Sequence, residues 1–72
     1  MPELYSSKEV IAALHRAGFD FVSQRGSHAK YRRTGDPTLT VIVPAGRKQI
    51  PRGTLRSILR QAQLDESALK PN

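Results

Sequence analysis

Apolar residues recur at helical spacing near the start of the chain. Ser6-Ser7-Lys8-Glu9 is typical of a capping box, and Gly18 is placed to end a helix with a left-handed residue. The apolar stripe between them consists of Val10, Ile11, Leu14 and Ala17. These signals predict a first helix that begins after Ser6 and ends at Gly18.

Two short segments with strand character follow. The stretch from Phe19 to Gln24 is rich in aromatic and branched residues, and Arg25-Gly26-Ser27 after it is typical of a tight turn. From His28 to Arg33 the side chains alternate between two faces, with Ala29 and Tyr31 on one face. The other face carries His28, Lys30 and Arg32.

A third alternating segment precedes a second helix. Leu39, Val41 and Val43 alternate with Thr40 and Ile42, and Pro44 ends this strand. Pro51 suits the first turn of a helix, but Thr54 is a competing N-cap, so the helix start is open by three residues. The apolar stripe of this helix is Leu55, Ile58, Leu59 and Ala62, and Asp65 to Leu69 favours a final turn.

Short sequential connections favour an antiparallel three-stranded meander. The predicted fold class is α+β, in the order α-β-β-β-α, as one domain over residues 1–72. We expect the two helices to cover one face of the sheet, which leaves the face with His28 open to water. The side chains expected to be buried under the helices are Ala29, Tyr31, Leu39, Val41 and Val43.

The charge balance narrows the class of partner. Lys and Arg number 12 against 6 Asp and Glu, a net charge of +6, which favours a polyanionic or acidic partner over a merely soluble basic surface. There is no cysteine, and no apolar run approaches the ~18 residues of a membrane span. The start of the chain lacks the layout of a signal peptide, so we expect a soluble cytoplasmic protein with no membrane association.

The chain also lacks the usual signals for cofactors. Two separated histidines and no carboxylate cluster predict no metal site, and the scattered glycines predict no phosphate-cradling loop. We therefore expect no metal and no small-molecule cofactor. His15, beside Leu14 in the first helix, is interpreted as a partly exposed helix residue.

Several motifs together resemble the HicA family of bacterial toxin–antitoxin ribonucleases. They occur in the family's order from about Ser6 to Leu69, and they are Ala17-Gly18-Phe19, Gly26-Ser27-His28 with Lys30-Tyr31-Arg32, Val41-Ile42-Val43-Pro44, and Lys48 through Gly53-Thr54-Leu55-Arg56-Ser57-Ile58-Leu59. The resemblance implies a double-stranded-RNA-binding-domain-like fold. It also implies that His28 is the histidine tied to mRNA cleavage, and that a HicB-type antitoxin covers the His28 site.

Two positions depart from the family pattern. Members often have another histidine shortly after the Val-Pro that ends the third strand, whereas this chain has Pro44-Ala45-Gly46-Arg47. This departure removes a possible helper for His28. Many members also have glycine near the end of the second helix, where this chain has Gln63, which affects only how that helix ends.

Cleavage of RNA requires few groups, because the 2′-hydroxyl is its own nucleophile. Histidine titrates near neutral pH, so His28 is the candidate base, and Lys30 and Arg32 are candidates to stabilise the charge of the transition state. Water or Lys30 would supply the second proton transfer. Ser27 is expected to bind a phosphate oxygen or to fix the turn, and Gly26 to adopt positive φ or let a phosphate approach.

The remaining basic residues leave alternatives open. Lys48 is a candidate RNA contact. Arg47, Arg52, Arg56 and Arg60 could bind phosphates, face an acidic antitoxin or be solvated, and the last three align along one side of the helix. The main hypothesis is a slow, metal-independent mRNA endoribonuclease toxin. The alternatives are a non-catalytic RNA-binding module and a protein that binds only a protein partner.

Overall fold

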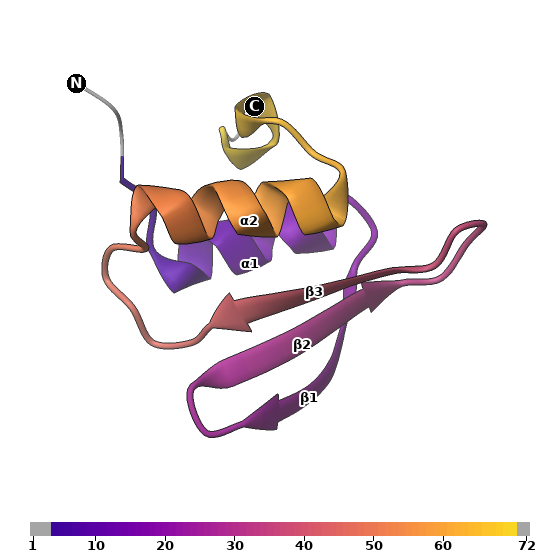
Figure 1. Cartoon of the computed structure of the whole chain (residues 1–72), viewed down its shortest axis with the longest axis horizontal. Coiled ribbons are helices and arrows are strands. Elements are labelled where there is room, and N and C mark those ends of the chain that lie inside the picture. Colours follow the sequence, from indigo (N-terminus) through magenta and orange to yellow (C-terminus); the bar gives the residue numbers. More distant parts are fainter. Residues whose placement is uncertain (1–3, 71–72) are drawn as a thin grey trace.

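A computed structural model describes residues 4–70 and shows a three-stranded antiparallel sheet with two helices (Figure 1). The sheet order is β1-β2-β3. The elements are α1 (Ser7–Arg16), β1 (Asp20–Arg25), β2 (His28–Arg33), β3 (Leu39–Pro44), α2 (Arg52–Ala62) and a short 3-10 helix, η1 (Glu66–Leu69). The α+β class and the order helix, three strands, helix are as the sequence predicts. No helix within residues 4–70 is long and apolar enough to cross a membrane.

The capping box at the start of α1 is confirmed. The Ser6 hydroxyl accepts a hydrogen bond from the Glu9 amide at 3.1 Å, and the Glu9 carboxylate accepts one from the Ser6 amide at 2.9 Å. Gly18 follows the helix with φ +93°, and the Phe19 amide donates to the Leu14 carbonyl at 2.9 Å. Because Phe19 completes the end of the helix, β1 starts at Asp20, one residue later than the sequence predicts.

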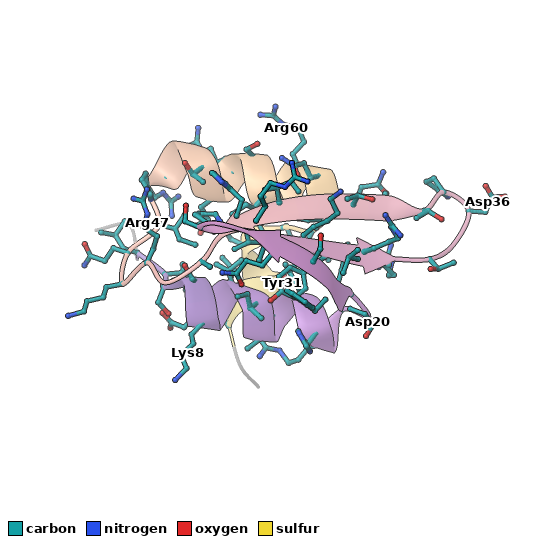
Figure 2. The ribbon with its side chains drawn as sticks, turned by 90° about the horizontal axis from the view of Figure 1, so that it is seen from below. Lys8, Asp20, Tyr31, Asp36, Arg47 and Arg60 are labelled. Atoms are coloured by element: carbon teal, nitrogen blue, oxygen red, sulfur yellow. The ribbon has the colours of Figure 1, made fainter. Side chains whose placement is uncertain are left out.

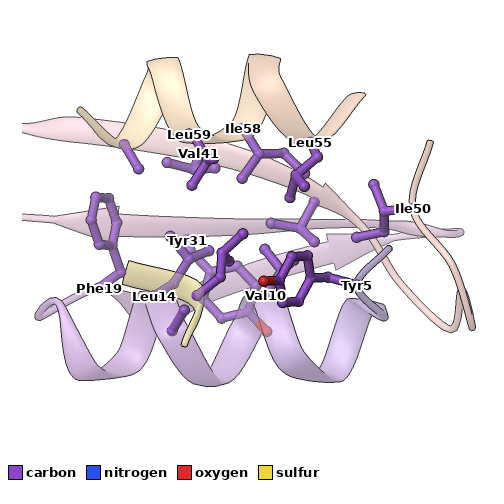
Figure 3. Packing of buried hydrophobic residues seen from close by; sticks show 14 of the residues in the cluster. Tyr5, Val10, Leu14, Phe19, Tyr31, Val41, Ile50, Leu55, Ile58 and Leu59 are labelled. Carbon is purple, nitrogen blue, oxygen red and sulfur yellow. The ribbon is translucent and has the colours of Figure 1, made fainter. Parts of the chain in front are cut away.

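The core lies between the helices and one face of the sheet (Figure 3). Exposure alternates along β2 and β3, and this alternation confirms the predicted inward face of Ala29, Tyr31, Leu39, Val41 and Val43. All six residues of β1 are exposed, so this strand extends beyond the cover of the helices. The alternate residues of β2 and β3 that face away from the helices are exposed or half-exposed. This face of the sheet is open, as expected for an antiparallel sheet packed on one side.

The second helix begins earlier than it would with Thr54 as its N-cap. Pro51 is the N-cap, its carbonyl accepts the Leu55 amide at 2.9 Å, and Thr54 lies inside the first turn. At the other end Gln63 takes a left-handed conformation with φ 56°, which explains why a glycine is favoured there. The predicted final turn is η1, where the Asp65 side chain accepts the Ser67 amide at 3.0 Å and Leu69 is buried.

Candidate functional site

His28 is the first residue of β2, directly after the β1–β2 turn. Arg25 and His28 pair across this turn, so it contains two residues, Gly26 and Ser27. Gly26 has φ +59°, a value that favours glycine at the first position of such hairpin turns, and this confirms the predicted positive φ. On its other side His28 pairs with Pro44 of β3. The register of three strands therefore determines where the imidazole lies.

The β1–β2 turn is connected to the loop that follows β3. The Ser27 carbonyl accepts a hydrogen bond from the Ala45 amide at 2.7 Å, and the Gln24 side chain donates to the Gly26 carbonyl at 3.0 Å. This bond joins the turn to the loop through the Ser27 backbone, so the role of the Ser27 side chain stays a prediction. The loop after β3 is held next to His28 as a result.

Two hollows open on either side of His28, and both are also lined by Ile42. We call one the helix-side hollow; it has a volume of about 200 Å³, and its remaining residues are Pro44, Arg47, Pro51 and Thr54. We call the other the strand-side hollow; it has a volume of about 330 Å³, and its remaining residues are Ser23, Arg25 and Lys30. His28 therefore stands where the two hollows meet.

Three cations line the two hollows beside the imidazole. Lys30 and Arg25 line the strand-side hollow, and Arg47 lines the helix-side hollow. In the part of the chain that the structure describes, none of the three forms an ion pair, and the His28 imidazole has no hydrogen-bond partner. The imidazole nitrogens and the three positive charges are thus available to an anionic ligand.

Some predicted site residues lie apart from His28. Arg32 is four residues along β2, a distance of roughly 13 Å at about 3.3 Å per residue, and it lines neither hollow. Lys48 lines neither hollow; it lines a third depression, at the start of α1, together with Lys8 and Arg47. Figure 2 shows Arg47 at one end of the molecule and Asp36, in the β2–β3 turn, at the other.

The arginines of α2 are divided between different environments. Arg52 forms an ion pair with Glu66 of η1, with 2.6 Å between the nitrogen and the carboxylate oxygen. Arg56 and Arg60 are exposed and line neither hollow. Arg52 thus has a partner within the chain, while Arg56 and Arg60 remain candidates for contacts with an acidic protein or with phosphates.

The second histidine has a different environment. His15 lies on α1, and its ring packs in a T-shaped arrangement with the ring of Tyr31, with 5.8 Å between the ring centroids. Tyr31 is on the buried face of the sheet, and burial raises the pKa of its phenol. Within residues 4–70, no three His, Cys, Asp or Glu side chains are grouped as a metal would require.

Six residues that line the hollows were not predicted as site residues from the sequence: Ser23, Arg25, Ile42, Pro44, Pro51 and Thr54. Ile42 had a usable signal, because an apolar residue out of phase with Val41 and Val43 must fall on the polar face. Arg25 could be placed opposite His28 only if the turn length were known. Thr54 belongs to another element, and no local pattern connects it to β2.

A comparison with protein families shows which family the chain is similar to. The family model described as HicA toxin of bacterial toxin–antitoxin matches residues 7–64, which include the β1–β2 turn, both hollows and α2. No curated protein matches the chain significantly.

Proposed function

Because this chain belongs to the HicA family of bacterial toxin–antitoxin toxins, we propose that it is an endoribonuclease that cleaves mRNA with His28 as its acid–base residue. Family membership makes the chain the toxin of such a system and implies an antitoxin as its partner.

One observation carries the proposal. His28 projects from the open face without a partner in the described chain, and Arg25, Lys30 and Arg47 line the hollows on its two sides. A histidine with a structural role in the core would be buried, and its ring nitrogens would be hydrogen-bonded, as buried polar groups generally are. An unpaired imidazole among cations suits proton transfer at a phosphodiester.

The reaction begins at the ribose 2′-hydroxyl. Neutral His28 accepts the proton of this hydroxyl while its oxygen attacks the adjacent phosphorus. The bond from phosphorus to the 5′-oxygen breaks, and this oxygen takes a proton from water or Lys30. The products are a 2′,3′-cyclic phosphate and a 5′-hydroxyl. Protonated His28 then returns its proton to the hydroxide or to the neutral Lys30 amine, so the atoms and charges balance without any other reactant.

Cations that line the two hollows would stabilise the charge of the transition state. The transition state carries additional negative charge on the non-bridging oxygens, and Lys30 and Arg47 lie where they can neutralise it from opposite sides of His28. Arg47 thus supplies a cation from the loop in which many family members have a second histidine. Acid–base assistance is worth about 10²–10⁴-fold, so with a single histidine we expect slow cleavage.

We further propose that the antitoxin is of the HicB type and covers the two hollows beside His28. A net charge of +6 on 72 residues favours an acidic surface on the partner. Arg56 and Arg60 are exposed on α2 and would add to such an interface.

The proposal is tested by incubating unstructured single-stranded RNA with the purified protein in EDTA. Two variants are compared with the wild type: His28→Ala, and His15→Ala as a control that removes the other histidine. We expect wild type and His15→Ala to cleave, His28→Ala to lose at least about 100-fold in rate, and the products to end in cyclic phosphate. RNA binding, measured by fluorescence anisotropy, should be similar in all three proteins.

Other outcomes identify the alternatives. Equal cleavage by His28→Ala would remove His28 from the mechanism. Binding without cleavage in all three proteins would favour a non-catalytic RNA-binding module. RNA binding no stronger than that of another small protein of equal charge would favour a protein that binds only a protein partner.

A further inference from the structure

The two hollows form one groove with His28 at its middle. They share His28 and Ile42, so a ligand seated against the imidazole has space on both sides. Their volumes, about 200 and 330 Å³, lie near or below the lower end of the roughly 300–1,000 Å³ that accommodates a drug-sized ligand. Each hollow therefore suits one small unit of a longer chain.

Each hollow offers positive charge and a hydroxyl group. Arg47 and Thr54 line the helix-side hollow, and Arg25, Lys30 and Ser23 line the strand-side hollow. RNA carries one phosphate per nucleotide, so a strand that crosses His28 meets cations before and after the cleaved bond. This arrangement fits a nucleotide on each side.

Ile42 adds an apolar surface at the junction. Its exposed fraction is 38%, and it lines both hollows. Its backbone amide donates to the Gln61 side chain at 3.2 Å, and Gln61 in turn donates to the Ser57 hydroxyl at 3.1 Å, so α2 holds this part of β3 in place. The side chain is therefore presented to the groove from a fixed backbone.

An apolar surface between cations selects for an unpaired base. Bases within a duplex are stacked on one another, whereas bases of a single strand expose apolar faces that proteins cover. We infer that one RNA strand lies in the groove with one nucleotide in each hollow, and that Ile42 contacts a base beside the scissile phosphate. This inference rests on the proposed RNA cleavage and adds Ile42 as a residue that determines substrate binding.

The test compares two matched substitutions, Ile42→Ala and Val22→Ala. Val22 is a strand residue with a similar exposed fraction, 40%, and it lines neither hollow. The substrate is a short RNA containing a mapped cleavage site, with either a normal or an abasic nucleotide next to the cleaved bond. Thermal unfolding of each variant controls for folding.

We expect Ile42→Ala to raise KM about fivefold with kcat within about twofold, since one to two methylene contacts are lost. Val22→Ala should change neither constant by more than about twofold. The abasic substrate should raise KM for the wild type by a similar factor and should add little for Ile42→Ala, because both changes remove the same contact.

Three outcomes would overturn the inference. The first is an unchanged KM for Ile42→Ala with unchanged antitoxin binding, and the second is a pair of effects that multiply as if independent. The third is an unchanged KM together with weaker antitoxin binding, which would assign Ile42 to the protein partner instead.

A different result would identify a failure of the proposed function itself. If the wild type cleaves no RNA, the catalytic proposal fails, and the inference is then decided by anisotropy with the same RNA. Weaker binding by Ile42→Ala than by Val22→Ala would support the groove as an RNA site. Equal binding by the two variants would refute it.

The variant Arg25→Gln can show which hollow binds the nucleotide on the 5′ side of the cleaved bond and which binds the nucleotide on the 3′ side. RNAs extended on only the 5′ or only the 3′ side of the cleaved bond are compared, with Lys8→Gln as a control for the loss of one positive charge. We expect Arg25→Gln to raise KM several-fold more for one extension than for the other, because Arg25 lines only the strand-side hollow. An equal increase for both extensions would contradict separate sites for the two nucleotides.

Discussion

Replacing Ser7 by alanine removes a hydroxyl that joins the start of α1 to the loop beside His28. Ser7 is buried, with 3% of its surface exposed. Its hydroxyl donates to the Pro44 carbonyl at 2.5 Å and accepts from the Arg47 amide at 2.9 Å, while its own amide donates to the Arg47 carbonyl at 2.9 Å. The substitution leaves the third bond in place and breaks the first two.

The expected cost follows from the two groups that lose their partner. A polar group left unsatisfied in the interior costs about 1–3 kcal/mol. Both broken bonds are partly buried, so water can replace only part of the lost hydrogen bonding. We therefore expect the free energy of unfolding to fall by about 2 kcal/mol, a large share of the roughly 5–15 kcal/mol that stabilises a typical domain.

Urea unfolding followed by far-UV circular dichroism measures this change. A matched control is Ser57→Ala, because the Ser57 hydroxyl also accepts a hydrogen bond, from the Gln61 side chain at 3.1 Å, but at a half-exposed position. The control should change the unfolding free energy by no more than about 0.5 kcal/mol. Amide hydrogen exchange should accelerate at Arg47 in Ser7→Ala, because this amide loses its acceptor.

A loss below about 0.5 kcal/mol for Ser7→Ala would refute the reasoning, as would an equal loss for Ser57→Ala. The result also bears on the site. Arg47 lines the helix-side hollow, so a loosened loop should raise KM for RNA in Ser7→Ala if Arg47 binds a phosphate.

Two further substitutions test backbone strain and burial. Gln63 has φ 56°, so Gln63→Gly should raise the free energy of unfolding by up to about 1 kcal/mol in urea titrations; a decrease would show that the glutamine side chain offsets the strain. Burial raises the pKa of Tyr31 above its ordinary value near 10, so stability is complete below about pH 10 and falls as the pH rises, because the unfolded chain loses the proton first. Urea unfolding at about pH 9 and 11 should therefore show a smaller loss for Tyr31→Phe than for the wild type, and an equal loss would exclude Tyr31 as the cause.

Much of the fold could be predicted from the sequence because its signals are local. The capping box around Ser6, the left-handed Gly18 and the alternation through Tyr31 each act over a few residues and need no distant partner. The same alternation placed His28 on the open face, where the structure has it. Local patterns thus determined which residues form each element and which face each side chain takes.

The composition of the site depended on contacts between distant parts of the chain. Arg25 and Ile42 reach His28 through strand register, and Thr54 reaches it because α2 begins at Pro51. The position of Arg47 depends on Ser7, forty residues earlier in the chain.

The same distant contacts separated residues that the sequence had grouped together. Arg52 forms an ion pair with Glu66, so it differs from the other arginines of α2 despite their equal spacing. Lys48 follows Arg47 in sequence and lines a depression at the start of α1 together with it, but only Arg47 also lines the helix-side hollow. Strand register, loop path and ion pairing depend on the packing of the whole domain, so the sequence by itself determined the elements and their faces, and only the tertiary structure decided which side chains surround His28.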